Sequence, residues 1–370
     1  MPTKEGFVAA QPGPATYDHE LVEAIARRVR HVSLELPQGT VDEEVRPIPE
    51  DDREHVFDPR VLRSARNKAA GIEPHAGAGG LMCERHFRRE THLVTDGEVA
   101  RDFRVVDLGD RGLPVWVLRP QSAGEGPAPV LLFEHGGGFT VGWFGVYEAF
   151  LMAVADLAGC VVVFPEVRLA PENRYPAQVD DCADVLDWML ANASELGIDP
   201  KRVCVMGDSA GGTLANATAL RHPEALALCV LLYAGVDIVE VPDWWGYDLY
   251  PVVDDEADIM HERVDNIKAW VGQTPYTGPD RVTVARNPEV SAAYATDEQL
   301  RRYPRTLVVC SEYDYLRPQD ERFAARLYSL GVDTRLIRYA GMEHGFVEKT
   351  GVYPQAEDLA NVLADEIRAL

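Results

Sequence analysis

The sequence Gly-Asp-Ser-Ala-Gly at residues 207–211 follows a short apolar run at residues 203–206 and opens a stretch with helical character. A Gly-x-Ser-x-Gly pattern between a strand and a helix forces a tight turn that exposes the serine hydroxyl. The small flanking residues are needed because neighbouring chains come close to this serine. Ser209 is therefore a candidate nucleophile, although an isolated pattern of this kind also fits an ordinary glycine-rich turn.

A second chemical signal is the sequence His-Gly-Gly-Gly-Phe at residues 135–139, directly after the apolar run at residues 129–133. A triple glycine at the end of a strand leaves backbone N–H groups free to point into a cavity. Such groups can hold the negative oxygen of a tetrahedral acyl-transfer intermediate. A phosphate-binding loop is the competing interpretation, but no Gly-Lys-Ser/Thr follows and the spacing is not Gly-x-Gly-x-x-Gly.

A serine hydroxyl becomes a good nucleophile when a neighbouring imidazole takes its proton. In this architecture the chain order is serine, acid, histidine. Of the ten histidines, only His261 and His344 lie well beyond Ser209. His344 follows a strand-like run at residues 334–339, where a catalytic histidine is expected, whereas His261 lies in a polar helical segment. We predict that His344 is the base.

The acid that orients this histidine is predicted to be Asp314. It lies just beyond the apolar strand at residues 305–310 and before a helix that Pro318 opens in its first turn. Glu312 and Asp320 are the rivals. Glu312 lies nearer the strand, and Asp320 is placed to complement the helix N-terminus.

The elements that must position these groups alternate between short apolar strands and helices. A hairpin is expected at residues 103–108 and 113–118, followed by strands at 130–133, 161–164, 203–206, 227–233, 305–310 and 334–339. Helices are expected at 147–157, 179–190 and 210–220, and after each of the last two strands. This pattern predicts an α/β fold with a mostly parallel central sheet and helices on both faces, and with catalytic groups at the carboxyl ends of the strands.

The interval from about 236 to 302 is too long for an ordinary connection and is predicted to form a helical cap, with a helix around residues 264–271. Residues 1–99 are interpreted as an N-terminal extension that supplies the other part of the cap, through helices at 18–30 and 61–70, with a flexible joint at 77–80. Residues 100–370 are the expected catalytic domain.

Four aromatic side chains are candidates to line an apolar substrate pocket. They are Phe139, Trp143, Trp244 and Trp245. Packing within the cap is the competing interpretation for Trp244 and Trp245, and the two interpretations are equally supported.

Together these motifs resemble the hormone-sensitive-lipase-like family of α/β-hydrolases, the bacterial group IV esterases. The resemblance runs from about residue 104 to the C-terminus and includes Arg-Leu-Ala-Pro-Glu at 168–172 and Asn-Pro at 287–288. It implies an α/β-hydrolase fold with a helical cap. It also implies that the backbone N–H groups of Gly137, Gly138 and Ala210 form the oxyanion hole. The chain departs from the family pattern at Glu134, at residues 166–167 and at Tyr315.

The expected activity is hydrolysis of short- to medium-chain carboxylic esters by a Ser-His-Asp mechanism, without a metal or an organic cofactor. Amide or peptide hydrolysis, or a specialised deacetylation, by the same residues is an alternative. A second alternative is a small-molecule receptor on this scaffold. A plant hormone receptor of this kind has a disabled histidine position, whereas this chain has His344 there.

Composition limits the partners. Sixty Asp and Glu residues against 36 Lys and Arg give a net charge of −24, which argues against binding to nucleic acid or anionic lipid and disfavours strongly anionic substrates. No signal-peptide pattern and no membrane-spanning run is present, so a cytoplasmic protein is expected. The six cysteines lack Cys-x-x-Cys spacing and are expected to be reduced and buried. The predicted partner is a small ester, and a homodimer is considered.

Overall fold

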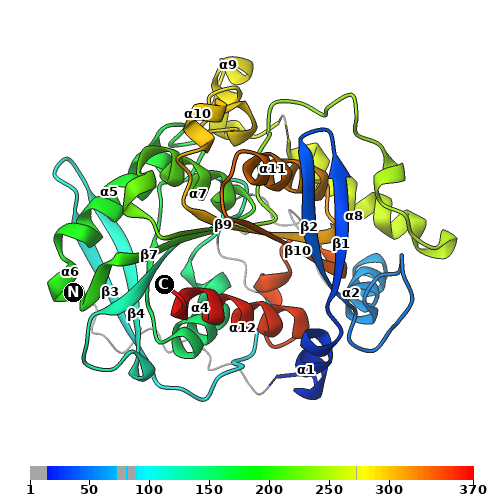
Figure 1. Cartoon of the computed structure of the whole chain (residues 1–370), viewed down its shortest axis with the longest axis horizontal. Coiled ribbons are helices and arrows are strands. Elements are labelled where there is room, and N and C mark those ends of the chain that lie inside the picture. The colour runs from blue at the N-terminus through cyan, green and yellow to red at the C-terminus, as the bar shows by residue number, and fades with distance from the viewer. Residues whose placement is uncertain (1–14, 73–80, 82–84, 86–88, 272) are drawn as a thin grey trace.

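The computed structural model describes residues 15–72, 81, 85, 89–271 and 273–370, and its centre is a ten-stranded sheet with helices on both faces (Figure 1). The strands are β1 (Arg30–Leu36), β2 (Gly39–Arg46), β3 (Val99–Asp107), β4 (Gly112–Pro120), β5 (Ala128–Glu134), β6 (Val161–Pro165), β7 (Ile198–Asp208), β8 (Leu228–Leu232), β9 (Arg305–Tyr313) and β10 (Thr334–Glu343). Their order across the sheet is β1-β2-β10-β9-β8-β7-β5-β6-β4-β3.

Most neighbouring strands are parallel. The run from β2 through β10, β9, β8, β7 and β5 to β6 is parallel throughout, whereas β1–β2, β3–β4 and β4–β6 pair antiparallel. The predicted α/β architecture is confirmed, including the opening hairpin that became β3 and β4. Because parallel strands end at a common edge, the residues that follow β5, β7, β9 and β10 are brought together there.

Alternation along the buried strands produces two hydrophobic cores. In β5, Leu131 and Phe133 face one core, while Val130 and Leu132 face the other. The first core is covered by α4 and α12, and the second by α5, α7 and α11 (Figure 1). The described helices are α1 (Glu20–Arg27), α2 (Pro59–Ala69), α4 (Phe144–Ala158), α5 (Ala177–Ala191), α6 (Ala193–Leu196), α7 (Ala210–Arg221), α8 (Ala257–Trp270), α9 (Arg281–Ala285), α10 (Asp297–Leu300), α11 (Arg317–Ser329) and α12 (Pro354–Arg368).

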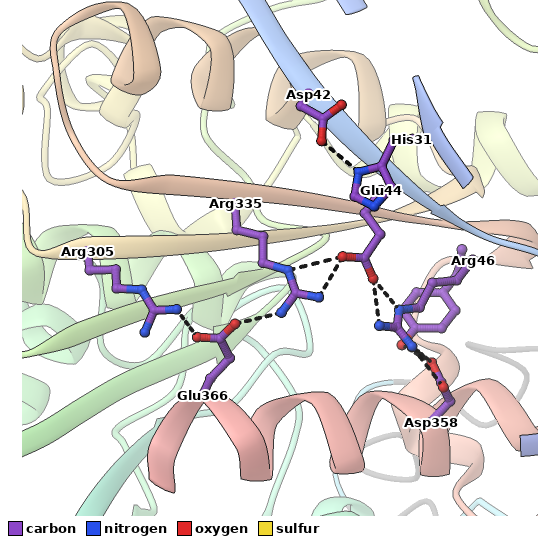
Figure 2. Close-up of polar contacts among 9 residues, drawn as sticks. His31, Asp42, Glu44, Arg46, Arg305, Arg335, Asp358 and Glu366 are labelled. Atoms are coloured by element: carbon purple, nitrogen blue, oxygen red, sulfur yellow. Dashed lines mark hydrogen bonds and ion pairs between the residues drawn. The ribbon is translucent and has the colours of Figure 1, made fainter. Parts of the chain in front are cut away.

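Strands β1 and β2 were not predicted from the sequence. They form a hairpin that extends the sheet beyond β10. A series of ion pairs connects β2 to the neighbouring strand β10 and to α12 (Figure 2). Arg335 of β10 contacts Glu44 of β2 at 2.6 Å, and Arg46 of β2 contacts Asp358 of α12 at 2.8 Å. The N-terminal part of the chain therefore contributes directly to the central sheet.

The long interval between β8 and β9 contains α8, α9 and α10. It contacts the N-terminal region just before α2, where the Val253 N–H donates to the carbonyl of His55 at 3.0 Å and the Phe57 N–H donates to Glu256 at 2.8 Å. Helix α1, in contrast, packs against α12. The joint predicted at residues 77–80 lies outside the described residues. Among the helices that are described, none is long and apolar enough to cross a membrane.

Candidate active site

Ser209 lies in the tight turn between β7 and α7. Its backbone has φ 55° and ψ −122°, a strained conformation for a residue with a side chain. The turn is held by the Ser209 N–H, which donates to the carbonyl of Leu232 at 2.9 Å. A methyl group on Gly211 would overlap the Glu134 carbonyl, and one on Gly207 would overlap that of Gly211. The Gly-x-Ser-x-Gly pattern is therefore required by close backbone packing around the serine.

The three predicted triad residues form one hydrogen-bonded line. The Ser209 Oγ lies 2.8 Å from Nε2 of His344, and Nδ1 of His344 lies 2.6 Å from Oδ2 of Asp314. They follow β7, β10 and β9, so three strand ends at one edge of the sheet bring them together. In this geometry the ring can take the hydroxyl proton while the carboxylate holds the opposite nitrogen protonated.

Asp314 is fixed in its own turn. Its side chain is fully buried, and its Oδ1 accepts a hydrogen bond from the Leu316 N–H at 2.9 Å. The rival Glu312 instead accepts from the Gly341 N–H at 2.7 Å and pairs with Arg338 at 3.1 Å. Glu312 thus contacts two residues within β10 and not His344.

The environment of His344 favours its role as a base. Burial disfavours the charged ring, but the adjacent Asp314 carboxylate outweighs burial, so the pKa of His344 is raised above its ordinary value. The ring of Tyr233 contacts the imidazole edge-on, with centroids 4.9 Å apart. The other rival histidine, His261, packs against Tyr247 in the cap interval, at a centroid distance of 4.2 Å.

The glycine loop after β5 is shaped for exposed backbone donors. Gly137 and Gly138 have φ values of 103° and 62°, and a methyl group on Gly137 would overlap the Val141 carbonyl. Within the described residues, the N–H groups of Gly137, Gly138 and Ala210 donate no hydrogen bond to another protein group. These three donors are thus available to an oxyanion, as expected.

Asp208 ties this loop to the nucleophile turn. Its Oδ1 accepts from the Gly136 N–H at 2.6 Å, and its Oδ2 accepts from the Tyr147 hydroxyl at 3.2 Å. Burial raises the pKa of Asp208 to about 7, with a further contribution from the Glu348 carboxylate. Asp208 was part of the predicted motif, but its positioning of the loop could not be foreseen from the pattern.

The comparisons with known proteins agree with this geometry. Residues 131–348 match the family model described as the alpha/beta hydrolase fold. Esterase LipI of Mycobacterium tuberculosis is 30% identical over 70% of this chain and 80% of its own length. Carboxylesterase NlhH of the same species is 30% identical, covering 76% of this chain and 86% of that protein.

The chain belongs to the hormone-sensitive-lipase-like family of α/β-hydrolases. Among solved structures, a hyperthermophilic esterase from the archaeon Pyrobaculum calidifontis is 26% identical, with a TM-score of 0.68 over 85% of this chain and 98% of that one. A thermostable esterase from Pseudomonas putida, 22% identical with a TM-score of 0.71 over 86% and 98% of the two chains, shares the fold.

The four predicted pocket residues lie in different surroundings. Phe139 follows the oxyanion loop and stacks on Tyr276 at 3.7 Å. Trp245 packs against Tyr315, at a centroid distance of 5.6 Å and next to the triad acid. Trp143 is half-buried directly before α4. Phe139 and Trp245 therefore contact residues at the site, as a pocket wall requires.

Trp244 contacts a different part of the molecule from Phe139 and Trp245, and its place in a substrate pocket stays a prediction. Its ring is 39% exposed and lies 3.9 Å from the guanidinium of Arg322 on α11. The groove that it lines also contains Val236 and Phe323 but no triad or oxyanion residue. A favourable cation–π contact holds this tryptophan on the α11 side of the molecule.

Trp270 was missed by sequence reasoning. It ends α8, and its ring lies 5.7 Å from that of Phe139. A methyl group on Gly138 would clash with the indole, whose Nε1 is buried without a partner in the described part of the chain. A helix was predicted at residues 264–271, but periodicity alone gave no sign that its last turn covers the oxyanion loop.

Proposed function

We propose that the protein is a serine carboxylesterase in which Ser209 is the nucleophile, His344 the general base and acid, and Asp314 the residue that orients the imidazole. The observation that carries the proposal is the hydrogen-bonded line from Oγ of Ser209 through His344 to Asp314, at 2.8 and 2.6 Å. The named relatives are esterases and a carboxylesterase, which supports the same enzyme class.

The mechanism is a two-step acyl transfer. His344 removes the Ser209 proton as the hydroxyl oxygen attacks the ester carbonyl, and the imidazolium is stabilised by Asp314. The backbone N–H groups of Gly137, Gly138 and Ala210 bind the oxyanion. His344 then gives its proton to the leaving alcohol. Water attacks the acyl-enzyme by the same steps in reverse and releases the carboxylic acid.

Short- to medium-chain acyl groups are the proposed substrates. The rings of Phe139, Trp270 and Tyr276 pack beside the oxyanion loop and limit the space next to the scissile carbonyl. A relative from Pseudomonas putida, 29% identical over 80% of this chain and 92% of its own length, is named ethyl acetate hydrolase, which agrees with a small acyl group.

The domain division is part of the proposal. Residues 236–302 would form the cap over a catalytic domain of residues 100–370, and residues 1–99 would supply part of the cap as well as the extension that adds β1 and β2 to the sheet. The contacts of His55 and Phe57 with the interval between β8 and β9 support a shared cap. A homodimer and a cytoplasmic location stay predictions, and light scattering of the purified protein tests the first of them.

The decisive assay is hydrolysis of p-nitrophenyl esters from acetate to laurate by the wild type and by Ser209→Ala. We expect activity that peaks at short to medium chains and is lost in the variant. Ser329→Ala, which removes an exposed hydroxyl on α11, is the matched control and should retain wild-type rates. An active Ser209→Ala enzyme would overturn the assignment of the nucleophile.

A further inference from the structure

A cavity of about 160 Å³ adjoins the catalytic histidine. It lies between α2, α8 and the segment that follows β10, with His344 and Gly345 in its wall. Among the residues that the structure describes, the other charged ones in its lining are four cations, Lys68, Arg89, Arg263 and Lys349, and two carboxylates, Glu343 and Glu348. The cavity is therefore locally basic, although the whole chain carries a net charge of −24.

The two carboxylates are already engaged. Glu348 pairs with Arg89 at 2.8 Å. Glu343 lies 3.1 Å from Nε of Arg263 and accepts a hydrogen bond from the Tyr353 hydroxyl at 3.0 Å. These contacts pair both carboxylates with arginines and leave neither of them to balance Lys68.

Arg263 has spare donor capacity where water is largely excluded. The residue is 8% exposed, and its terminal Nη2 is buried without a hydrogen-bond partner among the described residues. A buried donor without a partner costs free energy, and a charged one costs more than a neutral one. An incoming acceptor that carries negative charge would remove this cost.

Lys68 provides the second unsatisfied cation. It is half-buried on α2 and forms no ion pair or hydrogen bond with a side chain that the structure describes. Burial lowers the pKa of Lys68, and the nearby cations Arg263, Lys349 and Arg89 lower it further against the opposing effect of Glu343. Mutual repulsion among these cations indicates that positive charge in the cavity is not fully compensated.

We propose that this cavity binds a carboxylate on the alcohol portion of the substrate, so that the enzyme prefers esters whose leaving group carries an acid. The side of the scissile bond follows from the proposed function, on which this inference rests. His344 hands its proton to the leaving oxygen, so the group attached to that oxygen extends on the His344 side. Arg263 and Lys68 would then donate charge-assisted hydrogen bonds to the carboxylate.

The overall negative charge does not oppose this binding once the substrate has arrived. The field of the whole surface slows the approach of an anion. Inside a partly buried cavity, however, contact with nearby cations is screened much less than interactions across the surface. The expectation from composition alone, that strongly anionic substrates are disfavoured, is thus reversed at this position for a substrate with one acid group.

The test compares two acetate esters of nearly the same shape, meta-acetoxybenzoate and meta-acetoxybenzamide, by the rate of acetate release. We expect the wild type to show a kcat/KM about tenfold higher for the acid than for the amide, the size of a charge-assisted hydrogen bond. Lys68→Met should bring this ratio near one, and Lys68→Arg should restore most of it. Arg66→Met removes an exposed cation from the same helix and should leave the ratio unchanged.

Three outcomes overturn the inference in distinguishable ways. Equal or faster hydrolysis of the amide by the wild type removes the anion site while the esterase function stands. A preference for monophenyl succinate over phenyl acetate, without one for meta-acetoxybenzoate, would place the acid on the acyl side. If p-nitrophenyl acetate is also not hydrolysed, the proposed function itself fails.

Discussion

Buried acidic side chains are held in different ways in two regions of the same sheet, beside β2 and in the loops next to Ser209. At the β2 edge, Arg46 lies 2.6 Å from Glu44 and 2.8 Å from Asp358 (Figure 2). Around Ser209, Asp208 and Glu134 form no ion pair with any described residue. Paired charges thus hold an added hairpin in place, whereas Asp208 and Glu134 support the loops beside Ser209 through hydrogen bonds.

The unpaired carboxylates are protonated more readily than usual. Burial raises the pKa of Glu134 to about 8, against the hydrogen bond that the Thr218 hydroxyl donates to it at 2.8 Å. The pKa of Asp208 is raised to about 7 by burial and by Glu348. At these raised pKa values the two carboxyl groups carry less negative charge near neutral pH than ordinary carboxylates do. The comparison therefore shows two uses of buried acidic groups. Beside β2 they form ion pairs that hold a hairpin in the fold, and beside Ser209 they accept hydrogen bonds with a raised pKa.

The largest effect is expected for Asp314→Asn, which removes the charge that acts on His344. We expect kcat on p-nitrophenyl acetate to fall about 10⁴-fold, because the amide favours the wrong imidazole tautomer. Glu312→Gln is the matched control, since Glu312 contacts Arg338 and the Gly341 N–H rather than His344. It should keep kcat near the wild-type value. A loss below tenfold for Asp314→Asn would mean that charge beside His344 contributes little.

Breaking the paired region should cost stability and spare the chemistry. Arg46→Met leaves Glu44 and Asp358 buried without their shared partner and should lower the free energy of unfolding by about 3–5 kcal/mol. Urea denaturation measures this loss, and kcat per folded molecule should not change. Arg53→Met, which removes the exposed guanidinium that pairs with Asp51, should lower the free energy of unfolding much less. Similar losses of unfolding free energy in the two variants would contradict the expectation that a buried ion pair matters more for stability than an exposed one.

A third variant tests the unpaired region through pH. A carboxyl group whose pKa is higher in the folded protein stabilises the fold below its unfolded pKa, and this stabilisation is lost as pH rises through the folded pKa. For Glu134 the loss should run from about the ordinary value of 4.5 up to about 8. The glutamine in Glu134→Gln cannot ionise. The unfolding free energy of the variant minus that of the wild type should therefore be larger at pH 9 than at pH 4, by about a few kcal/mol. A constant difference across this range would show that folding does not raise the pKa of Glu134.

The smallest effect concerns the pH dependence of activity. His344 must be neutral to accept the Ser209 proton, and its pKa is raised above the ordinary value of 6.5 because the Asp314 carboxylate outweighs burial. The acid limb of kcat/KM should therefore have a midpoint above 6.5. The midpoint should move down in Asp314→Asn and move little in Asp208→Asn. A wild-type midpoint at or below 6.5 would contradict the pKa assigned to His344.

Local sequence patterns indicated three residues that the structure brings together, because each of them follows its own strand. Ser209, Asp314 and His344 come after β7, β9 and β10, and parallel strands place their carboxyl ends at one edge. Contacts between distant segments were not accessible in this way. Lys68 and Arg263 lie on different helices, and no pattern shows that they line one cavity with His344.

The β1–β2 hairpin shows the same limit. Val32, Leu34 and Leu36 alternate with polar residues, a pattern that is typical of a strand. The parallel pairing of β2 with β10 depends on ion pairs to Arg335 and could not be predicted from either segment alone. Trp244 and Trp245 also show that sequence position does not give tertiary contacts. They are adjacent in the chain, but Trp244 contacts Arg322 and Trp245 contacts Tyr315.

The most direct test of the central claim is covalent labelling by diethyl p-nitrophenyl phosphate, followed by mass spectrometry of the intact protein and of its peptides. We predict one diethylphosphoryl group per chain, attached to Ser209, with release of one equivalent of p-nitrophenolate and parallel loss of esterase activity. Labelling should be far slower in Asp314→Asn. Loss of activity with the label on another residue, or full activity after Ser209 is labelled, would contradict the proposed mechanism.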